Sequence, residues 1–315
     1  MKKFASFLLS ALLVLSLAAC GSNGGTQSTA SESSVDSTAS SEAESSVAAT
    51  EEPTATPEPT EEPSTQPTLE ETVLLDENNI KVTATGLYFS SVGGAPDLEV
   101  HVENNTDGDI VISSGEYIAV NGCMVRGIFT IQVPAGESAD DYLMFLDDEF
   151  EEAGIETVSD IKLSVRAVDA NWSEICSSDY VTVKTSAYGT VETPAVDGDV
   201  LYDEGGVKIV MLGTEEDEDL DFYFPTYVKL YIENNTDQDI TVKTLDFKAN
   251  GEITQCSLSG ELFAGARRFT ELRLDAGSCT QNGITELKDL SFYFSILDFA
   301  TYNEITKSDT VTLEF

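Results

Sequence analysis

Residues 98–109 read LEVHVENNTDGD, and residues 228–239 read VKLYIENNTDQD. In both stretches apolar residues alternate with polar ones until the segment E-N-N-T-D begins. A period of two is typical of a β-strand that buries one face and exposes the other. Asn and Asp tolerate left-handed backbone and bond to nearby amides, so both E-N-N-T-D segments are predicted to be hairpin turns.

The rest of the chain shows the same repetition, at an offset of about 130 residues. Matching pairs at this offset are 73–77 with 200–204, Asn121-Gly122 with Asn250-Gly251, and Ala135-Gly136 with Ala264-Gly265. Self-similarity over such a length is the signature of a structural repeat. The sequence therefore predicts two folding units, 71–188 and 197–315, joined by a linker at 189–196.

Each copy is predicted to be all-β, an antiparallel two-sheet β-sandwich of about seven or eight short strands. The alternating pattern returns near the end of both copies, at 161–167 and 290–296. Residues 147–153 are predicted to form one short helix that ends at Gly154, because glycine accepts the left-handed cap conformation. Gly283 takes the matching place in the second copy.

These repeated motifs resemble those of a known group of proteins. The D-E-x-x-I/V-K opening, the E-N-N-T-D segment, the N-G pair, the A-G bend and the short helix that ends in Gly-Ile are similar to the immunoglobulin-like repeats of uncharacterised lipoproteins from Gram-positive bacteria. The resemblance covers both copies and implies two tandem immunoglobulin-like β-sandwiches on the outer face of a cell membrane. It implies no activity, since a fold alone does not supply one.

The N-terminal residues have the features of an export signal. Two lysines precede an almost wholly apolar run at 4–17, which is too short to span a bilayer as an ordinary helix. The run ends in Leu-Ala-Ala-Cys, which resembles the lipobox of bacterial lipoproteins. This resemblance implies that 1–19 is a signal peptide and that Cys20 carries the lipid that anchors the protein to the extracytoplasmic face of the membrane. The alternative is an ordinary secretory signal with a chance cysteine.

Residues 20–70 are predicted to form a disordered stalk that begins at the lipidated cysteine. After Cys20 the tract consists mainly of Ser, Thr, Ala, Glu and Pro, with no aromatic residue, Lys or Arg. Such a composition cannot bury enough apolar surface to offset the loss of conformational entropy. Repulsion between the acidic residues and the stiffness of proline favour an extended stalk that holds the folded part away from the membrane. Composition leaves open whether the stalk carries glycans.

Acidic residues dominate both copies. Residues 71–195 hold 23 acidic and 5 basic residues, and residues 196–315 hold 24 and 9, which gives about −18 and −15. This charge excludes nucleic acid and anionic lipid headgroups as electrostatic partners. Like charge also keeps an exposed protein soluble, and it leaves cationic partners and divalent ions open.

The sequence holds few residues that could carry chemistry. His101 is the only histidine, and the alternation of its strand places it toward solvent between two glutamates. No phosphate-binding loop, nucleophile elbow or paired metal motif is present, so we expect no catalytic residue, no cofactor and no enzymatic activity. Trp172, which matches Tyr302, is interpreted either as a core or edge aromatic or as a platform that stacks on carbohydrate.

Four cysteines follow Cys20. Cys123 and Cys176 lie in the first copy, and Cys256 and Cys279 lie in the second. An exported protein permits disulfides, but these positions do not match between the copies, so the fold cannot depend on a common bridge. The sequence leaves open whether each pair forms a disulfide or stays as buried free thiols.

The best candidate contact site lies where the copies differ in length. Residues 213–228 exceed their counterparts 86–98 by three residues, and loops on a rigid sandwich commonly carry binding. The alternative is a solvated acidic run followed by core residues. The acids are weak candidates for Ca²⁺ and the aromatics are candidate contacts: Glu215, Glu216, Asp217, Glu218, Asp219 and Asp221, then Phe222, Tyr223, Phe224 and Tyr227.

Two functions fit these features. The first is a non-enzymatic, membrane-anchored surface protein that binds or scaffolds an envelope component or an extracellular partner. The second is an accessory lipoprotein subunit of an envelope transporter or a wall-processing complex. The sequence identifies no ligand for either.

Overall fold

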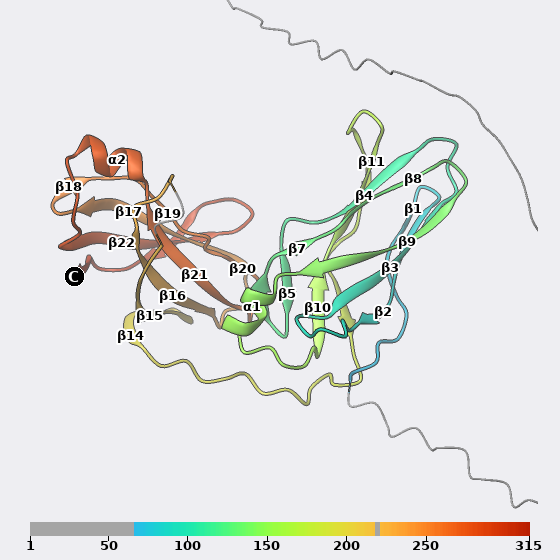
Figure 1. The fold of residues 1–315 in the computed structure, drawn as a ribbon, viewed down its shortest axis with the longest axis horizontal. Helices are drawn as coiled ribbons and strands as arrows, with labels where there is room; N and C mark the ends of the chain where they lie inside the picture. The colour runs from blue at the N-terminus through green and yellow to red at the C-terminus, as the bar shows by residue number, and fades with distance from the viewer. Residues whose placement is uncertain (1–65, 218–220) are drawn as a thin grey trace, which may run out of the picture. The chain divides into compact units, whose positions relative to one another are not determined.

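The computed structural model describes residues 66–217 and 221–315. Within these ranges the chain is mostly β-strand and turn, with two short helices, α1 (Asp147–Glu152) and α2 (Ala276–Gln281) (Figure 1). The all-β class predicted from the sequence is confirmed. Cys20 and almost all of the predicted stalk lie outside the described residues.

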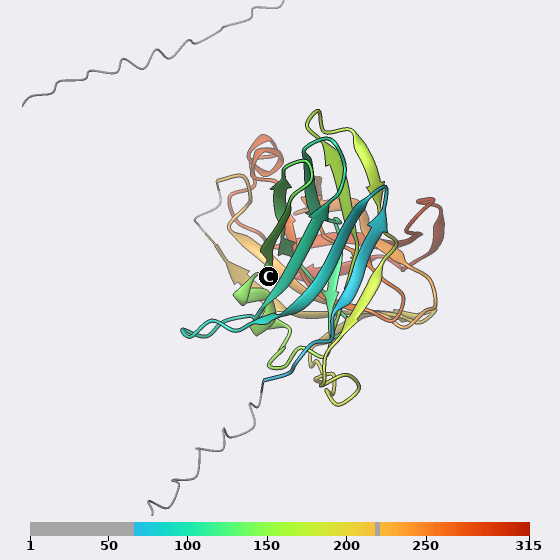
Figure 2. The same ribbon diagram turned by 90° about the vertical axis from the view of Figure 1, so that its right-hand side faces the viewer.

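The first sheet of the first repeat is antiparallel, and Figure 2 shows its blue and teal strands side by side. Every second residue of its central strand is buried, as the alternating sequence predicts. The strand order is β1-β2-β3-β9-β7: β1 (Thr72–Glu77), β2 (Ile80–Tyr88), β3 (Asp97–Asn104), β9 (Ser138–Phe145) and β7 (Gly127–Ile128).

The second sheet of this repeat consists of two rows of strands that continue each other. Only Ser164 separates the strands β10 and β11, and only residues 115–117 separate β4 and β5. One row is β12-β11-β4-β8 and the other is β13-β10-β5-β6: β4 (Ile110–Ser114), β5 (Ile118–Val120), β6 (Cys123–Val125), β8 (Thr130–Val133), β10 (Asp160–Leu163), β11 (Val165–Asp169), β12 (Glu174–Ser177) and β13 (Val181–Lys184).

The second repeat has the same plan with longer, uninterrupted strands. Its first sheet has the order β14-β15-β16-β21, and a parallel bridge between β21 and β6 continues it into the row β6-β5-β10-β13 of the first repeat. In its second sheet β17 pairs with β22. The strands are β14 (Asp199–Glu204), β15 (Val207–Glu216), β16 (Thr226–Asn234), β17 (Ile240–Ala249), β18 (Glu252–Ile253), β19 (Cys256–Ser257), β20 (Glu261–Leu262), β21 (Arg267–Leu274), β22 (Asp289–Asp298), β23 (Glu304–Lys307) and β24 (Val311–Glu314).

Both repeats have the strand pairing of an immunoglobulin-like sandwich. In that fold, strands B and E are neighbours in one sheet, and strands C, F and G are neighbours in the other. Here β3 pairs with β9, while β4 pairs with β11 and β11 with β12. The second repeat matches this with β16 and β21 in one sheet and β17, β22 and β23 in the other. The predicted fold is therefore confirmed, with one short helix in each repeat.

The E-N-N-T-D segments are not hairpin turns, so that prediction is wrong. Strand β3 ends at Asn104 in one sheet, and β4 begins in the other sheet, so the segment crosses between sheets. The reason is the fully buried side chain of Asn104. Its Nδ2 donates to the carbonyl oxygens of Val133 at 3.1 Å and Pro134 at 3.0 Å, at the end of β8 in the opposite sheet.

The other repeated motifs also hold loops in place. Asp109 Oδ1 accepts a hydrogen bond from the Ala135 amide at 3.0 Å, which ties the crossover to the A-G bend. Asp239 and Ala264 repeat this contact at 2.7 Å. Asn121, with a φ of 51°, begins the hairpin between β5 and β6, and its side chain donates to the Thr157 carbonyl at 2.7 Å. The residues that the copies share therefore build the fold.

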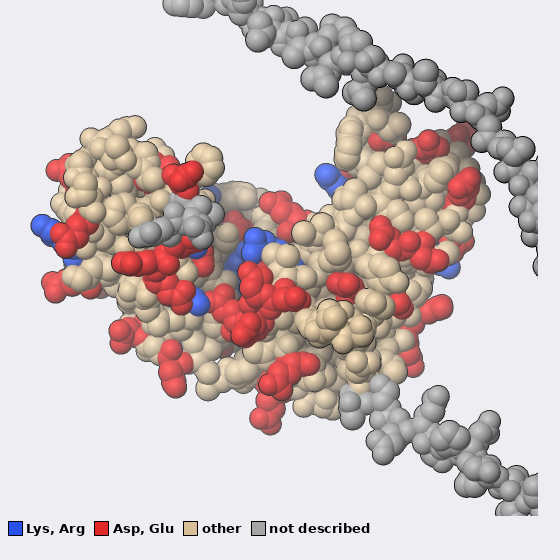
Figure 3. Space-filling model, viewed as in Figure 1, with Lys and Arg blue, Asp and Glu red and all other residues tan. Residues whose placement is uncertain are grey.

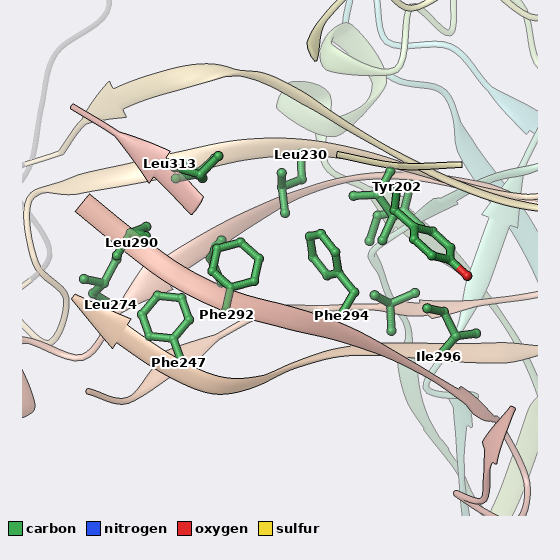
Figure 4. Close-up of a cluster of buried hydrophobic side chains, with 14 of the residues drawn as sticks. Tyr202, Leu230, Phe247, Leu274, Leu290, Phe292, Phe294, Ile296 and Leu313 are labelled. Atoms are coloured by element: carbon green, nitrogen blue, oxygen red, sulfur yellow. The ribbon is translucent and has the colours of Figure 1, made fainter. Parts of the chain in front are cut away.

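Two clusters of buried apolar side chains form the cores. In the second repeat, the rings of Phe247 and Phe292 stack at 5.4 Å, and Phe294 meets Phe292 edge-on at 5.2 Å (Figure 4). This cluster also includes Ala119 and Met124 of the first repeat. Both repeats belong to one compact unit, and the predicted division into two folding units stays a prediction.

The short helices end as predicted. Gly154 and Gly283 follow α1 and α2 with φ values of 63° and 68°, the left-handed conformation that glycine adopts without strain. The four cysteines of the described region are free thiols: Cys123, Cys176 and Cys279 are buried, and Cys256 is half-buried. Burial is the first cause that raises the pKa of each thiol.

Candidate functional site

The predicted acidic loop is shorter than the sequence indicated. Glu215 and Glu216 belong to strand β15, where they pair with Tyr227 and Thr226 of β16. Glu218 and Asp219 lie outside the described residues, as does Cys20. Asp221 is described and is exposed.

Basic and phenolic groups engage the acids that precede the loop. Tyr227 Oη donates a hydrogen bond to Glu215 Oε2 at 2.7 Å, and Lys229 Nζ lies 3.4 Å from Glu215 Oε1. These two neighbours lower the pKa of the Glu215 carboxyl, the tyrosine most. Asp217 Oδ2 lies 3.4 Å from Arg273 Nη2. In residues 66–217 and 221–315, no group of three or more His, Cys, Asp and Glu side chains could hold a metal ion.

The four aromatics proposed as contacts separate into two kinds. Phe224 and Tyr227 are buried, with exposed fractions of 9% and 7%. The prediction that they contact a partner is therefore corrected: they are core and framework residues of the second repeat. Phe224 packs in the core of the second repeat, and the Arg273 guanidinium covers the Tyr227 ring at 3.9 Å. Phe222 is 82% exposed and Tyr223 is half-buried, so only these two are open to a partner.

Three tyrosines are expected to lose their phenolic protons late as pH rises. Burial is the first cause that raises the pKa of Tyr117, Tyr227 and Tyr231 to about 12. The ordinary value is about 10, so the folded protein holds these protons longer than the unfolded chain does. Their contribution to stability is therefore complete below about pH 10 and is lost as pH rises towards about 12.

An ultraviolet absorbance titration of tyrosinate formation measures this. We expect a late phase from these three residues, and Tyr227→Phe should remove one proton from it. Ionisation of all 11 tyrosines in a single early phase, with the protein still folded, would contradict the expectation.

Four of the five arginines of the chain lie near one another, on β21 and on the segment after β6. Arg126, Arg268 and Arg273 line a cavity of about 350 Å³. Arg267 is buried outside this lining, and its Nη1 donates to Thr193 Oγ1 at 2.8 Å. Figure 3 shows blue basic atoms among red acidic ones near the middle of one face. This cluster was not predicted from the sequence, although the run Arg267-Arg268 in so acidic a chain was a visible signal.

Acidic side chains of both repeats complete the cavity. Glu149 of α1 bonds through its side chain to both the backbone amide and Nε of Arg126. Glu271 Oε2 accepts a hydrogen bond from Arg273 Nε at 2.6 Å, while Arg273 Nη1 is buried with no hydrogen-bond partner among the described atoms. Glu152 also lines the cavity and lies 2.7 Å from Lys229 Nζ. The cavity therefore needs both repeats.

The two repeats differ at these positions. Leu98 pairs with Leu143 in the first repeat, and Val228 pairs with Leu272 in the second, which aligns β9 with β21. By this register Ala139 and Met144 stand where β21 has Arg268 and Arg273. Helix α1 reads DDEFEE, whereas α2 reads AGSCTQ. Because the shared fold does not require them, these charged residues are the best candidates for a specific role.

His101 lies on the outer face of the first sheet with part of its ring exposed. Its Nδ1 is 2.6 Å from Oδ1 of Asp140, the residue opposite it on β9, a partner that sequence reasoning missed. The neighbour on its other side is Thr83 of β2. Within the described residues the only hydrogen bond of the His101 ring is the one to Asp140, so no nucleophile is joined to it.

Trp172 and Tyr302 occupy matching hairpin tips rather than a core. They are 70% and 54% exposed, and both have positive φ values, 63° and 56°. Their amides donate to the carbonyls of Asp169 and Asp298, which closes each turn, and the second turn is one residue longer. The core interpretation is therefore wrong, and both rings are accessible.

No protein-family model and no curated protein matches the sequence. Among the solved structures that are similar, three have a TM-score of 0.21 each: a protein of unknown function from Porphyromonas gingivalis W83 (13% identity, 75% of this chain and 100% of that chain), the Salmonella enterica SafA pilin in complex with the SafB chaperone (12%, 75% and 96%), and the Amycolatopsis orientalis exo-chitosanase CsxA (11%, 69% and 25%). At this TM-score the likenesses carry no argument about function.

Proposed function

We propose that this protein is a membrane-anchored surface protein that binds a partner outside the cytoplasm and catalyses no reaction. The observation that carries the binding role is the cavity between α1 and β21, because its charged lining differs between two otherwise similar repeats. Residues that neither pack in the core nor make the loop contacts shared by both repeats point to recognition of a partner.

The anchor rests on the sequence at 17–20, with its cysteine directly after Leu-Ala-Ala. In the described ranges no helix is long and apolar enough to cross a membrane. The lipid on Cys20 is therefore the membrane attachment that we propose, and the stalk that follows would hold the repeats away from the surface.

The absence of catalysis is proposed from the surroundings of His101. A general base needs a reacting group within hydrogen-bond reach, and within 66–217 and 221–315 the only hydrogen bond of the His101 ring is to Asp140. A charge-balanced pocket of arginines and acids binds polar groups without requiring a reaction.

Cys20→Ala is expected to abolish lipid labelling and to move the protein from the membrane fraction to the soluble fraction. Without the acyl chains the apolar contacts that hold the protein at the bilayer are lost. Metabolic labelling with a fatty-acid analogue, followed by fractionation, measures both effects. Cys256→Ala, a matched cysteine variant in the second repeat, should remain labelled and membrane-bound. An unlabelled Cys20→Ala protein that stays in the membrane would refute the anchor.

Binding is tested separately by cross-linked capture from solubilised envelope with the full chain. We expect a partner that is lost with Arg268→Gln and retained with Arg166→Gln, because Arg166 is exposed on β11, outside the lining of the cavity. Equal capture by both variants would remove the cavity from the proposed function.

A further inference from the structure

The cavity continues into a second hollow. Arg126, Ser259 and Arg268 line the first cavity of about 350 Å³ and also an adjoining one of about 310 Å³. Each volume lies at the lower end of the range of about 300–1,000 Å³ that small-molecule sites occupy. Together they form an extended groove, which suits a short linear ligand better than a single compact one.

A tyrosine side chain lines each of the two hollows of this groove. Tyr223 lines the first hollow and Tyr117 lines the second, and both are half-buried. The Tyr117 ring is held edge-on against Phe299 at 5.1 Å, so its position is fixed. The face of a tyrosine ring packs against the C–H groups on one face of a polar, saturated ring.

The charges of the first hollow nearly balance. Its lining holds three arginines and the four acids Asp148, Glu149, Glu152 and Glu271. The repeats around it carry about −18 and −15, so an anionic ligand would be repelled on approach. A cation would meet the arginines that line both hollows. The balance therefore favours a neutral ligand.

Hydrogen-bond donors and acceptors that are not fully used within the described residues line the groove. The side chain of Arg126 is 63% exposed, and within the described part of the chain it donates only through Nε, to Glu149. The side chain of Arg268 is 16% exposed; its Nη1 donates to the Glu261 carbonyl at 3.2 Å, and the nearest carboxylate oxygen, on the same residue, is 3.8 Å away. Asp148 lines the first hollow and accepts no hydrogen bond from the described residues, and Ser257 and Ser259 add hydroxyl groups.

Burial in this groove makes each hydrogen bond between a donor and a ligand more favourable. Desolvation is the first cause that lowers the pKa of Arg268 from its ordinary value. A desolvated guanidinium gains from a ligand that supplies paired acceptors. Neighbouring hydroxyl groups on a sugar ring supply such acceptors, and they also donate to carboxylates without adding a negative charge.

Resting on the proposed binding function, we propose that the groove between α1 and β21 binds a neutral oligosaccharide, with Arg126 and Arg268 at its centre and Tyr223 and Tyr117 against the sugar rings. A peptide or protein partner is the competing occupant.

The test uses the full chain, purified in detergent, on a printed array of neutral oligosaccharides and of oligosaccharides that carry carboxylate or phosphate groups. We expect binding to neutral members, and calorimetric titration with the best of them should give a Kd about 10- to 100-fold weaker for Arg268→Gln and for Arg126→Gln. Arg126 is the more exposed of the two, so its variant tests the site even where Arg268→Gln unfolds. Arg166→Gln is the matched control and should bind as the unchanged protein does.

Three results would overturn the inference. They are no binding anywhere on the array, binding confined to the anionic members, and neutral binding that both cavity variants retain in full. If the array is blank while envelope capture still depends on Arg268, the saccharide inference fails and the proposed binding function stands. If capture and array are both negative, both proposals fail.

Discussion

Asn104→Ala and Asn234→Ala are each expected to lower the free energy of unfolding by about 2–4 kcal/mol. Both asparagines have exposed fractions of 0%. Nδ2 of Asn104 donates to Gly108, Val133 and Pro134, at 2.9–3.1 Å, and its Oδ1 accepts from the Thr106 amide at 3.1 Å.

Asn234 makes corresponding contacts in the second repeat, with two carbonyl acceptors instead of three. Its Nδ2 donates to the carbonyl oxygens of Gln238 at 2.8 Å and Phe263 at 2.9 Å, and its Oδ1 accepts from the Thr236 amide at 3.1 Å. Alanine leaves the buried carbonyl of Val133 or of Phe263 without this partner, whereas Gly108, Pro134 and Gln238 are exposed, so water can replace the asparagine there. Each such group costs about 1–3 kcal/mol, which sets the size of the effect.

Chemical denaturation followed by far-ultraviolet circular dichroism measures the loss. The neighbouring residues Asn105 and Asn235 are exposed, so Asn105→Ala and Asn235→Ala are matched controls that should change the unfolding free energy by no more than about 0.5 kcal/mol. If the buried and exposed variants have equal effects, the side chain of Asn104 does not link the sheets.

The example of Asn104 shows what sequence patterns could predict and what they could not. The alternation of 98–102 predicted the strand, its buried face and the place where it stops, because strand period is a local property. The direction of the chain after the stop depends on Val133 and Pro134, about 30 residues further on. Local turn propensity is equally consistent with a hairpin and with a crossover.

The candidate site was less predictable for the same reason. The acids of the 215–221 segment drew attention as a run, yet Glu215 and Asp217 interact with Lys229 and Arg273, which lie on adjacent strands. The cavity joins side chains about 120 residues apart, such as Glu149 and Arg268. No spacing rule in the sequence connects such positions, whereas comparison of the two copies would have singled out the arginines of β21.

Phe294→Ala is expected to lower the unfolding free energy of the second repeat by about 3–5 kcal/mol. The ring has an exposed fraction of 0% on β22, and it packs edge-on against Phe292, so alanine leaves a cavity that neighbouring strands fill only in part. Phe222→Ala is the matched control, because that ring is 82% exposed.

The same variant tests whether the repeats fold separately. Their buried clusters are distinct except for Ala119 and Met124, and a single parallel bridge, Cys123 with Arg267, joins their strands. We therefore expect hydrogen exchange to show Phe294→Ala weakening protection in peptides of residues 197–315 while peptides of 71–188 keep theirs, and Asn104→Ala to show the reverse. Equal loss of protection in both repeats from either substitution would mean that the chain unfolds as one cooperative unit, and the division at 189–196 would then be wrong.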